Sequence, residues 1–171
     1  MVGLGLVATF IWGMGLLDDI NPIAPQKKLL AQIIGAVFLV LFGWRLMWVD
    51  NVILYVLLTM IWIVGITNAF NLLDNMDGLC GGVSLVALGF LAVMIPSPVV
   101  FVLLGVICGF FVFNFSPAKL FMGDCGAYFL GVNLACLTMN LGSGKSALLL
   151  LLIPIADTTF VTARRILKGK S

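Results

Sequence analysis

The sequence contains no histidine and no glutamate, and charged residues of any kind are scarce over its 171 positions. Nine Lys or Arg and seven Asp make up 9% of the chain, whereas 63% of the residues are apolar. A soluble domain carries about a quarter charged residues. The chain therefore lacks the charge needed to cover a water-facing surface. This excludes a soluble globular enzyme, a disordered chain and a nucleic-acid-binding protein with a basic face.

The four cysteines lack the spacing of a zinc site. They show no Cys-x-x-Cys pair, each lies in or beside an apolar run, and no histidine is available to complete a ligand set. We interpret the thiols as small, buried, apolar groups.

Long apolar runs dominate the chain. A membrane-spanning helix needs about 20 mostly apolar residues, with about 17 as the lower limit. No pattern of alternating ten-residue strands is present, which argues against a membrane barrel. The sequence predicts one all-α domain over residues 1–171, a polytopic membrane bundle of about seven transmembrane helices: 1–17, 29–49, 52–67, 79–95, 99–113, 125–141 and 146–163.

Strict alternation of seven spans places four connecting segments on one side of the membrane. These segments, 18–28, 68–78, 114–124 and 164–171, contain seven of the nine Lys and Arg residues, while Arg45 and Lys145 lie on the other side. Positively charged loops stay in the cytoplasm. The sequence therefore predicts a cytoplasmic location for these four segments.

Five of the seven aspartates lie in the same predicted cytoplasmic loops. The positive-charge count did not use them, so their position is an independent indication of a functional site. Within the second loop, polar residues recur at intervals of three and would share one face if the helix continued. The residues are Asp18 and Asp19 in the first loop, Asn68, Asn71, Asp74 and Asp77 in the second, and Asp124 in the third.

Carboxylates this concentrated raise one another's pKa unless a cation neutralises them. Oxygen ligands without histidine or thiolate favour Mg²⁺, with Mn²⁺ as the alternative. Mg²⁺ commonly binds one or two carboxylates together with substrate phosphates. We therefore expect a phosphorylated water-soluble substrate, and the membrane setting adds a lipid substrate. Lys27, Lys28 and Lys119 provide positive charge for the phosphate oxygens.

Other interpretations of these residues stay open at this point. Asn and Asp also favour helix caps and turns. An intramembrane aspartyl protease uses membrane aspartates, but Phe121 replaces the first glycine of its Gly-x-Gly-Asp element. A divalent-cation transporter would need polar groups through the membrane, whereas these acids stay at one face.

Three blocks of sequence resemble the polyprenyl-phosphate N-acetylhexosamine-1-phosphate transferases, glycosyltransferase family 4. The blocks are Leu17-Asp18-Asp19, the segment 68–79 and the segment 114–124, and their order and spacing match over nearly the whole chain. The resemblance implies Mg²⁺-dependent transfer of a sugar-1-phosphate from a UDP-sugar to undecaprenyl phosphate in the bacterial cytoplasmic membrane, with release of UMP. Such a step begins O-antigen, enterobacterial common antigen, teichoic-acid or peptidoglycan assembly.

The resemblance also implies a role for each matching residue, while leaving open direct attack or an aspartyl phospho-enzyme. Asp18 and Asp19 correspond to catalytic acids at the lipid phosphate, Asp124 to the principal Mg²⁺ ligand, Lys28 to a lysine near the phosphates, and Asn68, Asn71, Asp74, Asp77 and Asn114 to the substrate-binding site.

The last part of the chain bears on the branch of the family. Residues 154–170 resemble the N-acetylglucosamine type more than the muramoyl-pentapeptide type, which remains the alternative. Members of the family that the chain resembles are longer, and in them a His-rich loop follows the position that corresponds to Ser171 of this chain. We therefore expect this chain to be truncated at both ends, and a homodimer stays open.

Overall fold

A computed structural model describes residues 2–46, 48, 50–141 and 143–167. This part of the chain contains eight α-helices and no strand, which confirms the predicted fold class. The helices are α1 (Val2–Ile20), α2 (Pro25–Leu41), α3 (Val52–Leu73), α4 (Leu79–Met94), α5 (Pro98–Asn114), α6 (Gly123–Met139), α7 (Gly144–Leu150) and α8 (Leu152–Leu167).

Local turn chemistry explains where several helices begin. Asn51 precedes α3, and its side-chain oxygen accepts a hydrogen bond from the Leu54 N–H at 3.1 Å. Ser97 caps α5 in the same way, with Pro98 as the first helical residue. Proline suits this position because the first N–H groups of a helix have no partner within it.

The predicted boundaries need three corrections. Predicted span 29–49 ends too late, because α2 stops at Leu41 and Gly43 has a φ of 88°. Predicted span 52–67 ends too early, because α3 continues to Leu73. Predicted span 146–163 is two helices, α7 and α8, bent by 68°. Pro154 lies in the first turn of α8, where it removes no helical hydrogen bond.

Two helices, α1 and α3, are long and apolar enough to cross a membrane, and the bent pair α7–α8 is a third candidate if it forms one span. The helices α4 and α5 are apolar but shorter. The described residues thus contain two or three membrane-length helices, and the count of seven spans stays a prediction.

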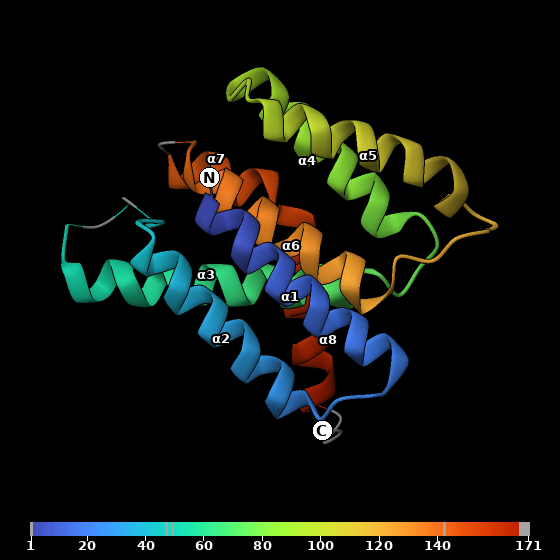
Figure 1. The fold of residues 1–171 in the computed structure, drawn as a ribbon, viewed down its shortest axis with the longest axis horizontal. Helices are drawn as coiled ribbons and strands as arrows, with labels where there is room; N and C mark the ends of the chain where they lie inside the picture. Colours follow the sequence, from blue (N-terminus) through green and yellow to red (C-terminus); the bar gives the residue numbers. More distant parts are fainter. Residues whose placement is uncertain (1, 47, 49, 142, 168–171) are drawn as a thin grey trace.

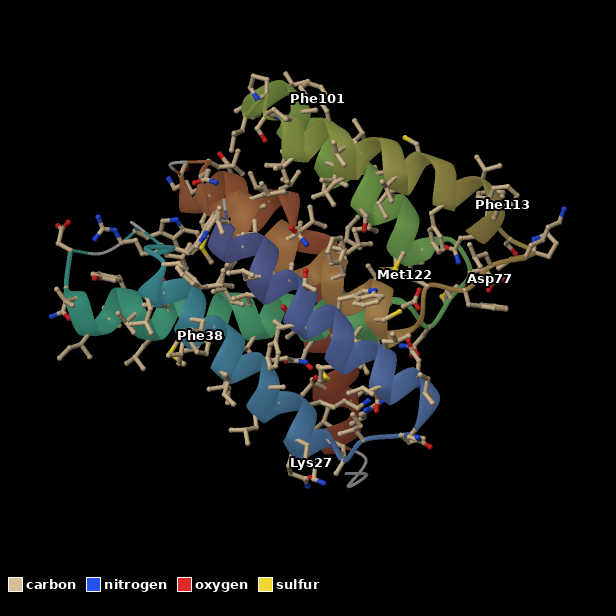
Figure 2. The ribbon with its side chains drawn as sticks, in the orientation of Figure 1. Lys27, Phe38, Asp77, Phe101, Phe113 and Met122 are labelled. Carbon is tan, nitrogen blue, oxygen red and sulfur yellow. The ribbon has the colours of Figure 1, made fainter. Side chains whose placement is uncertain are left out.

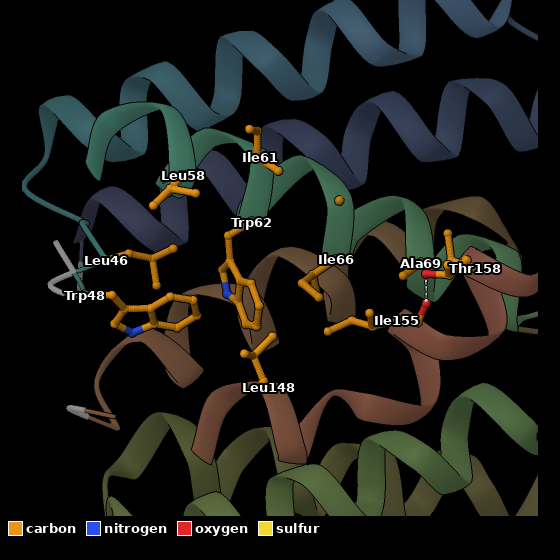
Figure 3. A pocket seen from close by; sticks show the side chains of 12 residues that line it. Leu46, Trp48, Leu58, Ile61, Trp62, Ile66, Ala69, Leu148, Ile155 and Thr158 are labelled. Carbon is orange, nitrogen blue, oxygen red and sulfur yellow. Dashed lines mark hydrogen bonds between the residues drawn. The ribbon is translucent and has the colours of Figure 1, made fainter. Parts of the chain in front are cut away.

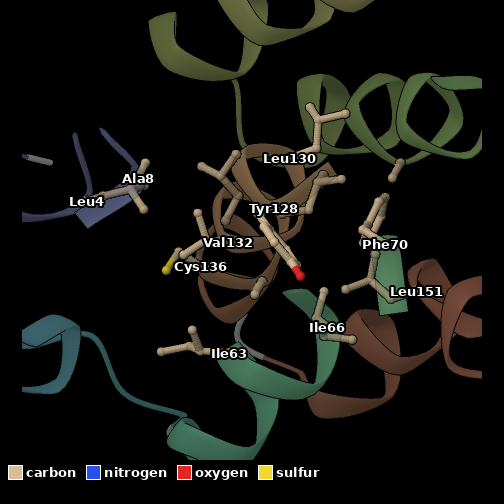
Figure 4. Packing of buried hydrophobic residues seen from close by; sticks show 14 of the residues in the cluster. Leu4, Ala8, Ile63, Ile66, Phe70, Tyr128, Leu130, Val132, Cys136 and Leu151 are labelled. Atoms are coloured by element: carbon tan, nitrogen blue, oxygen red, sulfur yellow. The ribbon is translucent and has the colours of Figure 1, made fainter. Parts of the chain in front are cut away.

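Helix α6 is the centre of the bundle. Every residue from Leu130 to Met139 is buried, and α1 and α3 pack along it (Figure 1). Figure 4 shows the packing around Tyr128 of α6, with Phe70 and Ile66 of α3 on one side. Since α6 begins at Gly123, this central position brings Asp124 close to the ends of its neighbours.

Two glycines allow α6 to approach its neighbours closely. A Cβ added at Gly131 would lie 2.7 Å from Thr67 Cα on α3. A Cβ added at Gly15 of α1 would lie 2.6 Å from Cys125 Cα. Both obstacles are backbone atoms, so a side chain at either glycine would push the two helices apart.

We therefore expect Gly131→Ala to destabilise the protein by about 1–3 kcal/mol, the usual cost of overpacking a core. Thermal unfolding in detergent measures this, with Gly105→Ala on α5 as the control, because a Cβ there meets nothing within 4 Å. Equal midpoints for the two variants would contradict the close approach of α3 and α6.

Candidate active site

The acidic residues lie at one end of the bundle, in or beside the loops that follow α1, α3 and α5. The chain leaves α1, α3 and α5 at this end, opposite the N-terminus (Figure 1). Figure 2 labels Asp77 and Met122 at this end, in the loops that follow α3 and α5. The structure thus brings together segments that are more than 100 positions apart in the sequence.

Lys28 links two carboxylates from different helices. Its ammonium group forms salt bridges with Asp18 Oδ2 of α1 and with Asp124 Oδ2 of α6, the latter at 3.0 Å. Asp18 is largely buried, while Lys28 and Asp124 stay partly exposed. The cluster is therefore accessible from the end of the bundle through Asp124 and Lys28.

Asp18 is held from both sides. Its Oδ1 accepts a hydrogen bond from the Ile23 N–H at 2.6 Å, in the turn between α1 and α2, while its Oδ2 faces Lys28. The short turn thus places a carboxylate and its counter-ion side by side. This turn contains Asn21-Pro22 and leads to Pro25 at the start of α2.

Helix α3 contributes an amide and a carboxylate. Asn71 Nδ2 donates to Asp124 Oδ1 at 2.8 Å. Asp74 follows the last residue of α3, and burial raises the pKa of its carboxyl to about 6, with a further increase from the charges of Asp124 and Asp19. The backbone of Gly123 opposes this increase. Burial at the end of α3, more than neighbouring charge, therefore sets the pKa of Asp74.

Asp19 has different contacts from its neighbour. Its two carboxylate oxygens accept the backbone N–H groups of Asp124, at 2.8 Å, and of Cys125, at 3.1 Å. Asp19 thus caps the first turn of α6, although it belongs to α1.

The structure gives the remaining predicted residues other contacts. Asn68 pairs with the Gln32 amide of α2. Asp77 accepts a hydrogen bond from the Ala118 N–H at 3.1 Å and so joins the two loops at this end. Asn114 donates to the Leu120 carbonyl at 2.9 Å, and its buried Oδ1 has no hydrogen-bond partner among the described residues.

Sequence reasoning missed two residues that organise this region. Gln32 is buried and lies one turn beyond Lys28. A single amide within an apolar run was the sequence feature that could have indicated it. Gly123 has a φ of 67°, and no pattern around it distinguished a required glycine from a flexible one.

The donor set of the cluster fits Mg²⁺ in its chemistry. Asp18 and Asp124 supply carboxylate oxygens, and their shared contact with the Lys28 ammonium shows that both already face one cation. No group of three Asp or Cys side chains in the described ranges is arranged as a complete metal site. Mg²⁺ does not require such a group, because it commonly combines one or two carboxylates with substrate phosphates.

A family model described as glycosyl transferase family 4 matches residues 1–142. The chain belongs to this family. It is 37% identical to a probable undecaprenyl-phosphate N-acetylglucosaminyl 1-phosphate transferase of Bacillus subtilis (strain 168), over 98% of this chain and 53% of the relative. It is 35% identical to phospho-N-acetylmuramoyl-pentapeptide-transferases of Streptococcus pneumoniae (strain Taiwan19F-14), over 94% of the chain, and of Streptococcus gordonii (strain Challis), over 91%; each match covers 56% of the relative.

As a member of glycosyl transferase family 4, the chain is a membrane protein similar to bacterial membrane transferases, and it spans about half the length of these curated relatives. The family resemblance expected from the three sequence blocks is confirmed. Membership leaves the protease and cation-transporter interpretations without support. The two kinds of relative are almost equally similar, so identity alone does not separate the two branches.

Proposed function

We propose that this chain forms the catalytic core of a phosphoglycosyl transferase. The enzyme transfers N-acetylglucosamine-1-phosphate, or a related N-acetylhexosamine-1-phosphate, from a UDP-sugar to undecaprenyl phosphate and releases UMP. The observation that carries the proposal is the joining of Asp18, Lys28, Asn71 and Asp124 from four helices at one end of an apolar bundle. Family membership supports the reaction type.

The charge distribution supports an orientation for this site. The four segments that the sequence predicts on one side, 18–28, 68–78, 114–124 and 164–171, hold seven of the nine Lys and Arg residues, which is typical of the cytoplasmic side. UDP-sugars are water-soluble, so an active site at the cytoplasmic face of a bacterial cytoplasmic membrane can receive them directly. The transfer would then be the first membrane step in the synthesis of a cell-envelope polysaccharide.

An apolar pocket supports the choice of a lipid acceptor. It has a volume of about 300 Å³ and lies along α3, between that helix and α7–α8 (Figure 3). Ala69 lines it one turn before Leu73, where α3 ends beside the acidic cluster. Its other lining residues are almost all apolar: Leu46, Trp48, Leu58, Ile61, Trp62, Gly65, Ile66, Leu148, Ile155, Thr158 and Thr159.

The contacts of Asp18 favour direct attack by the acceptor over an aspartyl phospho-enzyme. Both oxygens of Asp18 are engaged, one by the Ile23 N–H and the other by Lys28, so neither is a free nucleophile. In direct attack, an oxygen of the lipid phosphate forms a bond to the β-phosphorus. The bond from this phosphorus to the bridging oxygen breaks, and UMP leaves with that oxygen.

The chain's own residues orient and neutralise the reacting groups. Asp18 orients the acceptor phosphate and takes any remaining proton from it. Lys28 offsets negative charge on the phosphates, and Asn71 fixes the rotamer of Asp124. Asp124 would hold Mg²⁺, which when bound neutralises charge on the diphosphate and the leaving UMP.

The proposal predicts UMP release that depends on a divalent cation. Membranes containing this chain, alone and extended to the length of the relatives, are supplied with undecaprenyl phosphate, Mg²⁺ and either UDP-N-acetylglucosamine or UDP-N-acetylmuramoyl-pentapeptide. We expect UMP with the first nucleotide, and its loss when EDTA is added.

Release only with the muramoyl-pentapeptide nucleotide would assign the chain to the other branch. No release from the extended protein with any UDP-sugar would overturn the proposal. Membranes from cells without the chain provide the background rate.

A further inference from the structure

The two adjacent aspartates at the end of α1 face different partners. Asp18 faces a lysine ammonium, whereas the hydrogen bonds of the Asp19 side chain are both to backbone N–H groups of α6. One of these N–H groups belongs to Asp124 itself. A carboxylate that accepts N–H groups in the first turn of a helix acts as an N-cap. The two acids therefore have different surroundings despite their adjacency.

The backbone of α6 is shaped to receive this cap. Gly123 has a φ of 67°, in the left-handed region that favours glycine. A Cβ at this position would lie 2.8 Å from Asp19 Oδ2, so a side chain would displace the carboxylate. Gly15, one turn earlier on α1, keeps the two helices in backbone contact at Cys125. The last turn of α1 and the first turn of α6 are thus fitted to each other.

We propose that Asp19 is a positioning residue that acts through Asp124 and takes no part in the chemistry itself. The expected change in Mg²⁺ dependence rests on the proposed function, whereas the contact of Asp19 with α6 does not. By fixing the Asp124 N–H, Asp19 sets the direction from which the Asp124 carboxylate leaves α6. It therefore holds that carboxylate against Lys28 and Asn71, ready for a divalent cation.

The distinction is testable because asparagine keeps one acceptor oxygen for the two N–H groups of α6, whereas alanine keeps none. An acid or base that exchanges protons cannot be replaced by asparagine. Asp19→Asn, Asp19→Ala and Asp18→Asn are compared in the extended protein. The first two remove the same charge and differ mainly in their ability to cap α6.

The first readout is the Mg²⁺ concentration that gives half-maximal UMP release. Asp19→Ala should raise it by about 10- to 100-fold, the usual cost of removing a group that orients a metal ligand. Asp19→Asn should stay within a few-fold of the parent, and Asp18→Asn should lose far more activity at every Mg²⁺ concentration. An Asp19→Asn variant as inactive as Asp18→Asn would overturn the inference.

The second readout does not depend on activity. Cys125 is partly exposed, and its N–H is one of the two that Asp19 holds. Alkylation of its thiol, followed by peptide mass spectrometry without Mg²⁺ or substrate, should be several-fold faster in Asp19→Ala than in Asp19→Asn. Equal rates would overturn the inference, even if the parent releases no UMP. Asp19→Ser, whose hydroxyl oxygen is still an acceptor, replaces the asparagine variant if that protein is not produced.

Discussion

We expect UMP release to fall by at least about 1,000-fold when Asp124 is replaced by Asn. The change keeps the size of the side chain and removes the charge that meets both Lys28 and the proposed metal. Loss of preorganised charge at a phosphoryl-transfer site costs catalysis heavily, because charge develops there in the transition state. Initial rates at saturating Mg²⁺ measure the loss.

Asp50→Asn is the matched control for this variant. Asp50 is exposed and lies before α3, at the opposite end of that helix from Asn71. The Asp50→Asn protein should keep the parent's rate of UMP release. Full activity in the Asp124→Asn protein would remove Asp124 from the proposed metal site. A comparable loss in the Asp50→Asn protein would mean that the assay responds to general damage.

The second large effect concerns Lys28. Replacing it by Met keeps much of the apolar stem but leaves the carboxylates of Asp18 and Asp124 without their shared cation. We expect a loss of at least about 100-fold in activity, because this charge also offsets the phosphates. We also expect the metal-free protein to lose about 2 kcal/mol of stability, the usual contribution of hydrogen bonds between charged groups.

Thermal unfolding with and without Mg²⁺ tests this second expectation. Mg²⁺ should raise the midpoint more in Lys28→Met than in the parent, since a divalent cation replaces the missing ammonium between the carboxylates. Lys27→Met is the control, because Lys27 is adjacent but exposed (Figure 2). A Lys28→Met protein with the parent's activity and stability would contradict the role of the salt bridges.

The sequence was sufficient to predict the fold class because membrane helices can be recognised from the length of their apolar runs. Four of the predicted spans end within three residues of the helices observed, for example 99–113 against Pro98–Asn114. The end of α2 at Leu41 was less predictable, because the apolar residues continue beyond it. The bend between α7 and α8 falls within a run of leucines, which gives no sign of it.

The candidate site was only partly predictable for a related reason. The interval of three from Asn68 to Asp77 suggested one shared face, but α3 ends at Leu73 and the backbone then turns. Asn71 therefore reaches Asp124, while Asp77 bonds to Ala118 in another loop. Charge patterns located the end of the bundle where the acids meet. They could not reveal which carboxylate faces a lysine and which faces a backbone N–H, because adjacent residues point in different directions on a helix.

The placement of Lys28 only ten positions after Asp18 has a consequence for how the protein is made. A ribosome delivers α1 and α2 long before α6, so Asp18 is in place at the end of α1 while Asp124 is still unsynthesised. A carboxylate buried there without a partner would be costly. The short turn between the two helices supplies Asp18 with a counter-ion from the same hairpin. The first two helices can thus be integrated as an electrically balanced pair, and the later arrival of α6 adds a second carboxylate to a lysine already in position.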